Sequence, residues 1–245
     1  MKTDIFIFGF NRPDLLKPQI DSLRRNIKSD YTINVVCDYR TPEHVGEFLK
    51  ICCEERVPFY SHKSEEQSSP SAYHGASVTW AYNEIISNES TDYAFLLDHD
   101  MFLIDDFDID EYMSDCDISG LSQTRGSTRY VWPGLMIMDM KKVKKYEFDF
   151  LPCVVDGHPL DTGGGNYPLV QNLNFKPTDV EYPDTFNGIN LLENDDGYGF
   201  ELHLNQKFVH FRNASSWHNQ YNVNQSSAKN GVIRIITESF CNGQE

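Results

Sequence analysis

Residues 93–100 read YAFLLDHD, and this stretch decides the fold. An unbroken apolar run, residues 93–97, leads directly into Asp98-His99-Asp100. Such a run is typical of a strand that is buried on both faces, as strands of parallel sheets are. Asp98 and Asp100 then stand where the strand ends and the chain turns. We therefore expect a buried strand whose end offers two carboxylates to a ligand.

Upstream of this strand, short apolar runs alternate with segments of helical periodicity. The expected strands cover residues 5–10, 33–37 and 57–60, and the expected helices cover 16–27, 42–52 and about 72–86, with a polar loop at 61–71. In the second helix Val45, Leu49 and Cys52 share one face. Strands that alternate with helices in this way predict an α/β fold with a mostly parallel, doubly wound sheet.

Three of the expected strands end in polar residues. Asn11 and Arg12 follow the first strand, Asp38 follows the second, and Asp98 and Asp100 follow the fourth. In doubly wound sheets, ligands bind beyond the carboxyl ends of the strands. These residues are therefore candidates for a binding site, although Asp38 would equally serve as a helix cap and Arg12 as a surface residue.

The second half of the chain has a less regular pattern. We expect strands at 118–122, 130–140 and 208–211, the second of them bent or bulged at Pro133-Gly134. Between residues 151 and 199 the chain is rich in Gly, Pro, Asn and Asp, which is typical of loops that shape binding sites. No repeat or clear linker interrupts the sequence, so we expect a single domain over residues 1–245.

The composition narrows the class of protein. A formal net charge of −16 disfavours nucleic-acid binding, which usually needs a basic face. No apolar run approaches the roughly 20 residues of a membrane-spanning helix, and the first residues do not have the pattern of a signal peptide. The six cysteines form no C-x-x-C pair, so we expect reduced, buried thiols and a cytoplasmic protein.

The spacing of Asp98 and Asp100 favours a divalent cation. Carboxylate oxygens are hard ligands that suit Mg²⁺ or Mn²⁺, and such an ion can bridge the oxygens of a phosphate group. An acidic protein that binds an anionic diphosphate also needs a cation between the two. Because further aspartates crowd residues 105–110, an Asp-x-Asp match alone is weak, and its position after a buried strand supports the inference.

The segment from Gly75 to Asp100 resembles the core signature of GT-A-fold glycosyltransferases, in which a helix containing Gly and Asn precedes a strand that ends in Asp-x-Asp. Here the helix carries Gly75 and Asn83. Residues 8–13, FGFNRP, are similar to the first strand and donor loop of that family, and Asp38 matches the position that reads the nucleotide base. Tyr82 departs from the pattern, because many relatives carry Arg there. The resemblance covers roughly residues 1–140.

The resemblance implies a Rossmann-like GT-A fold in which residues 1–100 bind a nucleotide sugar and residues 101–245 bind the acceptor and catalyse transfer. It implies a UDP- or GDP-sugar donor, a glycan or other hydroxyl acceptor, and Mn²⁺ or Mg²⁺ as the cofactor. Asp98 would contact the ribose or the metal, Asp100 would bind the metal, and Asp38 would accept a hydrogen bond from the base. The expected donor-binding residues are Phe10, Asn11, Arg12, Asp38, Gly75, Asn83 and Asp98.

A further metal ligand is expected from the C-terminal half, as in the family. Of the eight histidines, His210 lies in the strand setting that most resembles the family's ligand, with His218 next. A lone histidine in an apolar strand is more often a core residue, and that alternative stays open. The expected metal ligands are thus Asp98, Asp100 and His210.

An inverting transferase needs a carboxylate base for the acceptor hydroxyl. Asp161 is the best placed, because it lies in the Gly-rich stretch LDTGGG at 160–165, where the backbone can pass close to a substrate. An ordinary Asp-Thr-Gly turn is the alternative, and Glu193, Asp195 and Asp196 are rivals. A retaining enzyme would need no base here. Trp132 and Trp217 suit either stacking on a sugar or packing in the core.

Two other classes share parts of this pattern. A phosphatase of the haloacid dehalogenase type also uses Asp-x-Asp at a strand end, but that motif normally lies near the N-terminus and continues with Thr or Val, whereas Met101 follows here. A non-catalytic, metal-dependent sugar-binding protein would use the aspartates of 105–110, but they lack EF-hand spacing. The sequence favours metal-dependent glycosyl transfer over both.

Overall fold

The computed structural model describes residues 1–38, 42–183, 185–186, 189–190 and 200–212, together with residues 214, 231 and 238. The chain forms two compact units whose segments are interleaved along the sequence. The first unit contains Met1–Gly9, Ser29–Asp98 and Asp108–Thr178, and the second contains Phe10–Lys28, His99–Phe107 and Asp179–Glu245.

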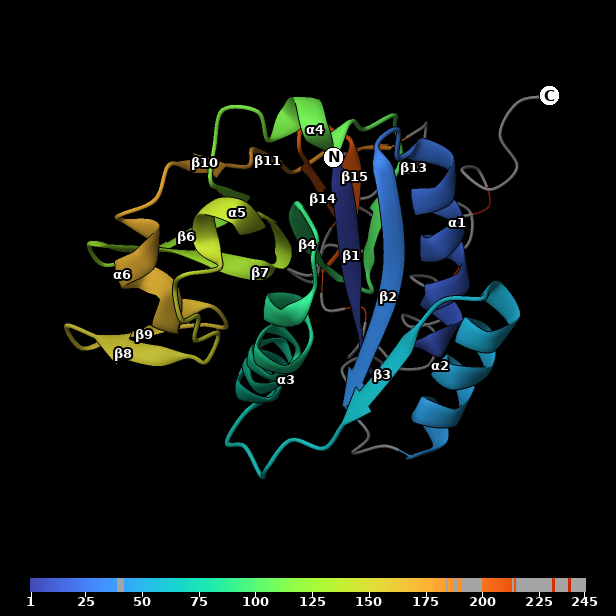
Figure 1. Cartoon of the computed structure of the whole chain (residues 1–245), viewed down its shortest axis with the longest axis horizontal. Helices are drawn as coiled ribbons and strands as arrows, with labels where there is room; N and C mark the ends of the chain where they lie inside the picture. Colours follow the sequence, from blue (N-terminus) through green and yellow to red (C-terminus); the bar gives the residue numbers. More distant parts are fainter. Residues whose placement is uncertain are drawn as a thin grey trace. The chain divides into compact units, whose positions relative to one another are not determined.

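The first unit is built on a seven-stranded sheet with the order β10-β6-β7-β4-β1-β2-β3 (Figure 1). Its strands are β1 (Lys2–Gly9), β2 (Asp30–Asp38), β3 (Phe59–His62), β4 (Tyr93–Asp98), β6 (Ile118–Arg125), β7 (Thr128–Asp139) and β10 (Phe175–Pro177). Strands β4, β1, β2 and β3 are mutually parallel, and β7 pairs antiparallel with both β4 and β6. The expected α/β fold with a mostly parallel sheet is confirmed.

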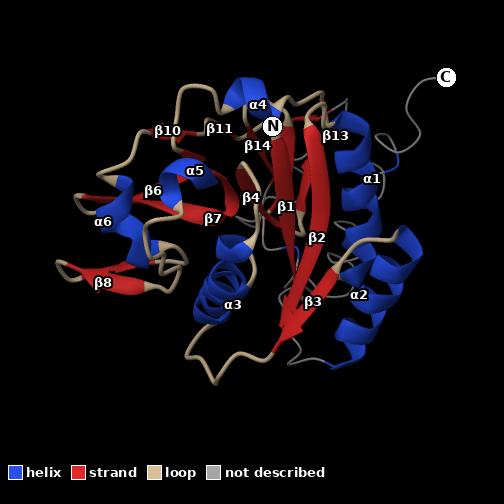
Figure 2. Cartoon of the chain, viewed as in Figure 1, coloured by secondary structure: helices blue, strands red, loops and turns tan. Residues whose placement is uncertain are grey.

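Helices cover both faces of this sheet. Phe48 of α2 (Pro42–Glu55) packs over Gly9, where an added Cβ would lie 2.7 Å from its ring. Val78 of α3 (Pro70–Glu84) joins a core cluster with Phe6 and Phe8, whose side chains point to the opposite face from Gly9 because strand residues alternate. The sheet is therefore doubly wound, and Figure 2 shows its strands in red with the helices in blue.

The helices differ in detail from the sequence expectation. In α2 the buried positions are Phe48 and Cys52, whereas Leu49 is 45% exposed, so Phe48 takes the core position that periodicity assigned to Leu49. Helix α3 begins at Pro70, two residues early, because the Ser69 hydroxyl caps it by accepting a hydrogen bond from the backbone N–H of Ala72.

The bulge expected at Pro133-Gly134 is present. Gly120 of β6 pairs with Met136 of β7 and the next residue, Leu121, pairs with Trp132, so β7 carries extra residues between these two pairs. The ring of Trp132 lies over Gly134, where a side chain would collide with it. The bulge therefore sets the position of Trp132 at this point of the strand.

The remaining elements of the first unit are short. They are η2 (Ile86–Asn88), α4 (Ile109–Tyr112), α5 (Met140–Val143), the β8–β9 hairpin (Cys153–Val155 with His158–Leu160), η3 (Gly164–Asn166) and α6 (Tyr167–Val170). The stretch from residue 151 onward, which was expected to be mostly loop, thus contains β8, β9, η3 and α6 with turns between them.

The second unit contains a four-stranded antiparallel sheet with the order β11-β14-β15-β5. Its strands are β11 (Val180–Glu181), β14 (Phe200–His203), β15 (Phe208–Phe211) and β5 (Met101–Leu103). The described part of this unit also contains η1 (Pro13–Leu15), α1 (Leu16–Asn26) and the short pair β12 (Thr185–Phe186) and β13 (Ile189–Asn190). Two side-chain amides of α1 donate to β5, from Gln19 to the Met101 carbonyl at 2.8 Å and from Asn26 to the Leu103 carbonyl at 2.7 Å. These bonds tie α1 to the strand that follows Asp100.

The described cysteines carry free thiols, but they are not all buried as expected. Cys37, Cys52 and Cys116 are buried, Cys153 is intermediate and Cys53 is exposed. Cys53 follows Cys52 on α2 and so faces away from the sheet. None of the helices among the described residues combines the length and the apolar character needed to cross a membrane.

Candidate functional site

In the second unit, the structure brings together Asp100 and His210, two of the three expected metal ligands. Asp100 directly precedes β5, and His210 of β15 pairs with Met101 of β5. The Phe211 amide donates to the Asp100 carbonyl at 2.9 Å, which fixes the backbone of Asp100 against β15. His210 Nε2 lies 3.6 Å from Asp100 Oδ1, and both residues are buried.

Two further residues of the same sheet face His210, and sequence reasoning missed both. Glu201 lies directly opposite His210 in the antiparallel pair of β14 and β15, and its Oε2 is 2.9 Å from His210 Nδ1. His203, two residues along β14, is on the same face and places its Nε2 3.3 Å from the same oxygen. Glu201, His203 and His210 offer ligand atoms that all lie within 4.8 Å of one another.

A pattern that could have revealed them is Glu-Leu-His at 201–203, followed by a short turn and then His210 in an apolar strand. In a hairpin, residues at i and i+2 share a face with the residue opposite them. The missing information was the register, which depends on the turn. Leu204, Asn205 and Gln206 all have positive φ, and Asp179 accepts a hydrogen bond from the Asn205 amide at 2.9 Å. Because no glycine marks this turn, propensity does not predict it.

The surroundings of this cluster favour a neutral His203 beside an ionised Glu201. Burial raises the pKa of Glu201, but hydrogen bonds from His203 and His210, together with the charges of His210 and Arg212, outweigh that effect and hold the pKa well below its usual value. Arg212 Nε lies 3.1 Å from Glu201 Oε1. Burial lowers the pKa of His203 more than the contact with Glu201 raises it. A buried neutral imidazole is the form that binds metals.

In the first unit, Asp98 lies at the end of β4, as the sequence predicted. It pairs with Phe8 of β1, and its Oδ1 is 2.9 Å from Nε2 of His74 on α3. The His74 ring stands edge-on to the rings of Phe8 and Trp132, with centroids 6.0 Å and 6.4 Å away. The aromatic contacts hold the imidazole against Asp98. His74 is a candidate site residue that the sequence did not single out.

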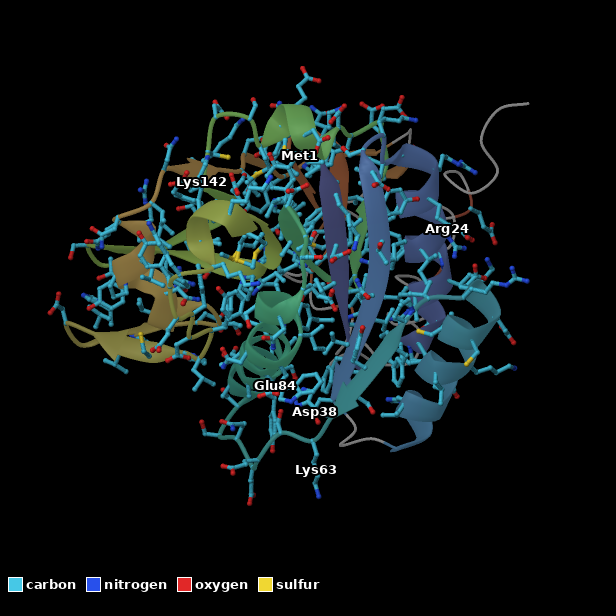
Figure 3. The ribbon with its side chains drawn as sticks, viewed as in Figure 1. Met1, Arg24, Asp38, Lys63, Glu84 and Lys142 are labelled. Carbon is cyan, nitrogen blue, oxygen red and sulfur yellow. The ribbon has the colours of Figure 1, made fainter. Side chains whose placement is uncertain are left out.

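Asp38 ends β2, and the neighbouring strand places His62 beside it. The two residues pair in register, and His62 is fixed by a 3.0 Å contact with Ser77 Oγ and by stacking on Trp80. Figure 3 labels Asp38 at this end of the sheet. β1 lies between β2 and β4, and the chain reverses its direction of strand addition between β1 and β4. Asp38 and Asp98 therefore flank the switch point at which doubly wound sheets bind ligands.

Asp161 follows β9 in the first unit, and its backbone and side chain both make hydrogen bonds there. Its backbone N–H donates to the Tyr130 hydroxyl at 3.1 Å, and its Oδ1 accepts from the Thr162 amide at 2.8 Å. The Thr162 hydroxyl donates to the carbonyl of Ser71, the second residue of α3. The turn is thus anchored to the start of the helix that carries His74. The rivals Glu193, Asp195 and Asp196 lie outside the described residues, as do Trp217 and His218.

The remaining donor-binding candidates have varied surroundings. Phe10 and Asn11 follow β1, and Asn11 has a φ of 55°. The Arg12 guanidinium is buried and donates to both carboxylate oxygens of Asp14, at 2.8 and 2.7 Å, and to the Ala214 carbonyl. Arg12 is therefore a structural anchor of the second unit and is not an exposed surface residue, whereas its contact with a phosphate stays a prediction.

Gly75 and Asn83 are placed differently along α3. An added Cβ at Gly75 would collide with the Phe150 carbonyl oxygen, so packing alone accounts for this glycine. Asn83 is exposed and lies about 12–14 Å further along the helix axis than His74, at the usual rise per residue. Tyr82 packs against Phe148 in the core. Nothing described in the first unit brings Asn83 to the strand ends.

Comparison with known proteins gives only distant likenesses. No family model and no curated protein matches the chain. Among solved structures, S. aureus TarS in complex with UDP is 14% identical with a TM-score of 0.41 and covers 61% of this chain and 50% of that one. The mannosyltransferase PcManGT from Pyrobaculum calidifontis, in complex with GDP-Man and Mn²⁺, is 10% identical with a TM-score of 0.38 over 57% and 44%. The glycosyltransferase GlyE of Streptococcus pneumoniae is 16% identical with a TM-score of 0.33 over 58% and 35%.

The chain spans about half the length of the TarS and PcManGT structures that it matches. At these identities and TM-scores, the comparisons assign the chain to no family and to no activity.

Proposed function

We propose that this protein transfers a sugar from a nucleoside-diphosphate sugar to a hydroxyl acceptor, with a divalent cation bound to Asp100 and His210. The observation that carries the proposal is the buried pair itself. A carboxylate and an imidazole face each other across 3.6 Å, directly after the strand that ends in Asp98. This placement supports the ligand set that the resemblance to GT-A glycosyltransferases implies.

The donor atoms of this pair fit Mn²⁺ or Mg²⁺, with Mn²⁺ favoured because one ligand is a nitrogen. When bound, the cation supplies positive charge to the diphosphate leaving group. Asp100 contributes a negative charge and His210 a neutral ligand, so the ion keeps most of its charge for the substrate. Asp98 lies two residues earlier in the chain, and its share in the ribose or metal contact is a proposal from the sequence.

The donor nucleotide is proposed to bind at the carboxyl ends of β1, β2 and β4. Asp38 is 7% exposed at the end of β2 and is assigned to the base. Asp98, beside His74, is assigned to the ribose or the metal. Phe10 and Asn11 remain candidates for the donor loop. Arg12 serves this loop through its bonds to Asp14 and Ala214, by holding the backbone in place.

In the reaction, the acceptor oxygen forms a bond to the anomeric carbon while the bond from that carbon to the diphosphate breaks. The acceptor oxygen attacks from the face opposite the diphosphate, so the anomeric configuration inverts, and Asp161 is proposed to take the proton of the acceptor hydroxyl. The hydrogen bond from Thr162 to Oδ1 orients the carboxylate. Trp132, half-buried and held over Gly134, offers an aromatic face to the sugar or the acceptor.

The phosphatase alternative is less well supported. A haloacid dehalogenase uses the aspartate at the end of its first strand, whereas Asp98 ends the fourth strand along this chain. The alternative of a non-catalytic sugar-binding protein relied on the aspartates of 105–110. Asp105 is bound by Lys207 and Asp106 by Lys28, so these two carboxylates are already paired.

Calorimetric titration with UDP- and GDP-sugars, in the presence and absence of Mn²⁺, separates the three classes. We expect one nucleotide sugar to bind at least about tenfold more tightly with Mn²⁺, because the cation removes charge repulsion. A phosphatase would instead hydrolyse a simple phosphate ester. A sugar-binding protein would bind the free sugar as well as its nucleotide derivative, and that result would end the transferase proposal.

A further inference from the structure

His210 has a partner on each of its two ring nitrogens, and this raises the question of which nitrogen faces a metal. Nδ1 is 2.9 Å from Glu201 Oε2, and Nε2 is 3.6 Å from Asp100 Oδ1. An imidazole that binds a metal through one nitrogen carries its proton on the other. The two partners therefore cannot both be on the metal with His210.

The first arrangement places a cation among Glu201, His203 and His210, whose ligand atoms lie within 4.8 Å of one another. In this arrangement the cation would bind a carboxylate that already contacts the positively charged Arg212. Arg212 Nε is 3.1 Å from Glu201 Oε1 and already balances this carboxylate. A divalent cation on the other oxygen of the same buried group would be repelled by the guanidinium, in surroundings that screen charge poorly. Glu201 is only 6% exposed, so water screens its side of the contact poorly, whereas the Arg212 side chain is 38% exposed and water screens part of the repulsion there.

The second arrangement places the cation between Asp100 and Nε2 of His210. Glu201 then accepts a hydrogen bond from Nδ1–H at 2.9 Å, which is an ordinary length for a charge-assisted bond. An ionised carboxylate accepts hydrogen bonds and donates none, so Nδ1 has to carry the proton. Carboxylate–histidine–metal chains of this type fix the ring and raise the basicity of the ligand nitrogen.

We propose that Glu201 is a positioning residue that holds His210 in its Nδ1–H form and directs Nε2 toward a divalent cation shared with Asp100. The inference rests on the proposed function for its assignment of Asp100 and His210 as ligands. Arg212 and His203 hold Glu201 in turn, from 3.1 and 3.3 Å. The antiparallel register of β14 and β15 places Glu201 opposite His210, so the sheet itself builds the chain of contacts.

The first part of the test needs neither metal nor sugar. Long-range ¹H–¹⁵N NMR of the full-length, metal-free protein reports which nitrogen of His210 is protonated. We expect the Nδ1–H form in the wild-type protein, and a loss of its dominance in Glu201→Ala. Protonation of Nε2 in the wild-type protein would overturn the inference and leave the proposed transferase activity untouched.

The second part measures Mn²⁺ affinity without nucleotide, from the free Mn²⁺ signal in electron paramagnetic resonance. Removing an outer partner of a ligand histidine typically costs 10–100-fold in metal affinity. We expect a loss of about tenfold for Glu201→Gln and a larger loss for Asp100→Asn. Glu181→Gln, at an exposed position of the neighbouring strand β11, is the matched control and should bind Mn²⁺ as the wild type does. Circular dichroism confirms that each variant is folded.

The His203→Gln variant decides between the two arrangements. If Glu201 only positions His210, this variant loses less than about threefold in Mn²⁺ affinity, because it removes no ligand. If His203→Gln instead loses Mn²⁺ binding while Asp100→Asn retains it, the cation lies among Glu201, His203 and His210, and the inference is wrong. Zn²⁺-bound protein gives a direct readout of the same choice, because the ¹⁵N shift of the ligand nitrogen moves. We expect the ¹⁵N chemical shift of His210 Nε2 to change.

Discussion

Asp161 is the residue on which the chemical step of the proposal depends. Its carboxylate accepts a hydrogen bond from Thr162, and an asparagine oxygen can accept the same bond. Asp161→Asn should therefore keep the turn and donor binding but lose proton-accepting ability. We expect transfer to fall at least about a hundredfold, the lower end of what a general base contributes. Single-turnover transfer assays, together with donor titration, measure the two effects separately.

Near wild-type transfer by Asp161→Asn would place the base elsewhere, and amide variants of Glu193, Asp195 and Asp196 would then identify it. If none of these carboxylates matters and the product retains the anomeric configuration of the donor, the enzyme is retaining and Asp161 is a turn residue.

Asp38 tests the nucleotide pocket at the switch point of the sheet. Its proposed bond to the base is charge-assisted, and such bonds contribute about 1.5–3 kcal/mol. Asp38→Ala should therefore weaken nucleotide affinity by about 10- to 150-fold while slowing transfer at saturating donor much less. Equilibrium titration with the free nucleotide measures the first effect. An unchanged affinity would return Asp38 to a role in capping α2.

Cys52 and Cys53 are adjacent in sequence but differ in burial. Burial raises the pKa of Cys52 to about 12, so almost no thiolate forms near neutral pH. Cys53 is exposed on the other side of α2. We expect iodoacetamide at pH 8 to alkylate Cys53 within minutes and to leave Cys52 unmodified in the folded protein, as read by peptide mass spectrometry. Equal labelling of both thiols would mean that α2 does not pack as described.

At the scale of elements, Gly75 tests the packing of α3. An alanine methyl group there would press on the Phe150 carbonyl oxygen and approach the Leu151 Cα at 3.0 Å, both of them backbone atoms that cannot turn aside. We expect Gly75→Ala to lower the free energy of unfolding by about 1–3 kcal/mol in urea denaturation. Gly46→Ala on α2 is the control, because nothing lies within 4 Å of its added methyl group.

In that open position, alanine should stabilise the helix by about 0.5–1 kcal/mol, since glycine loses more backbone freedom on folding. The two substitutions therefore have opposite expected signs. If Gly75→Ala is as stable as Gly46→Ala, α3 does not contact the 150–151 backbone, and the donor role of Gly75 becomes the better explanation for this glycine.

The elements that sequence patterns predicted well are those with strong local signals. The apolar runs before Asp38 and Asp98 gave β2 and β4, and Pro133-Gly134 gave the bulge of β7. Strands β5 and β14 were missed, because residues 101–103 and 200–203 are too short for periodicity to stand out. Glu201 and His203 were missed because the sequence does not show how β14 and β15 pair. His210 was found because residues 208–211 are apolar enough around it to be recognised as a strand.

At the scale of the whole molecule, the net charge of −16 makes the cation central to the account. A protein this acidic repels a diphosphate unless positive charge lies between them. The charge of Arg12 is already balanced by Asp14, whose carboxylate accepts hydrogen bonds from the guanidinium. A divalent ion on Asp100 and His210 is the proposed source of that charge. We therefore expect the transferase activity to require the ion.

The most direct test of this claim is donor turnover measured in EDTA and again after Mn²⁺ is restored. Release of the nucleoside diphosphate from the preferred donor is followed for the wild type and for Asp100→Ala, at equal amounts of folded protein. The account predicts that turnover falls to background in EDTA, returns with Mn²⁺, and stays at background in Asp100→Ala even with excess Mn²⁺. Full turnover in EDTA, or a fully active Asp100→Ala variant, would contradict metal-dependent transfer at this site.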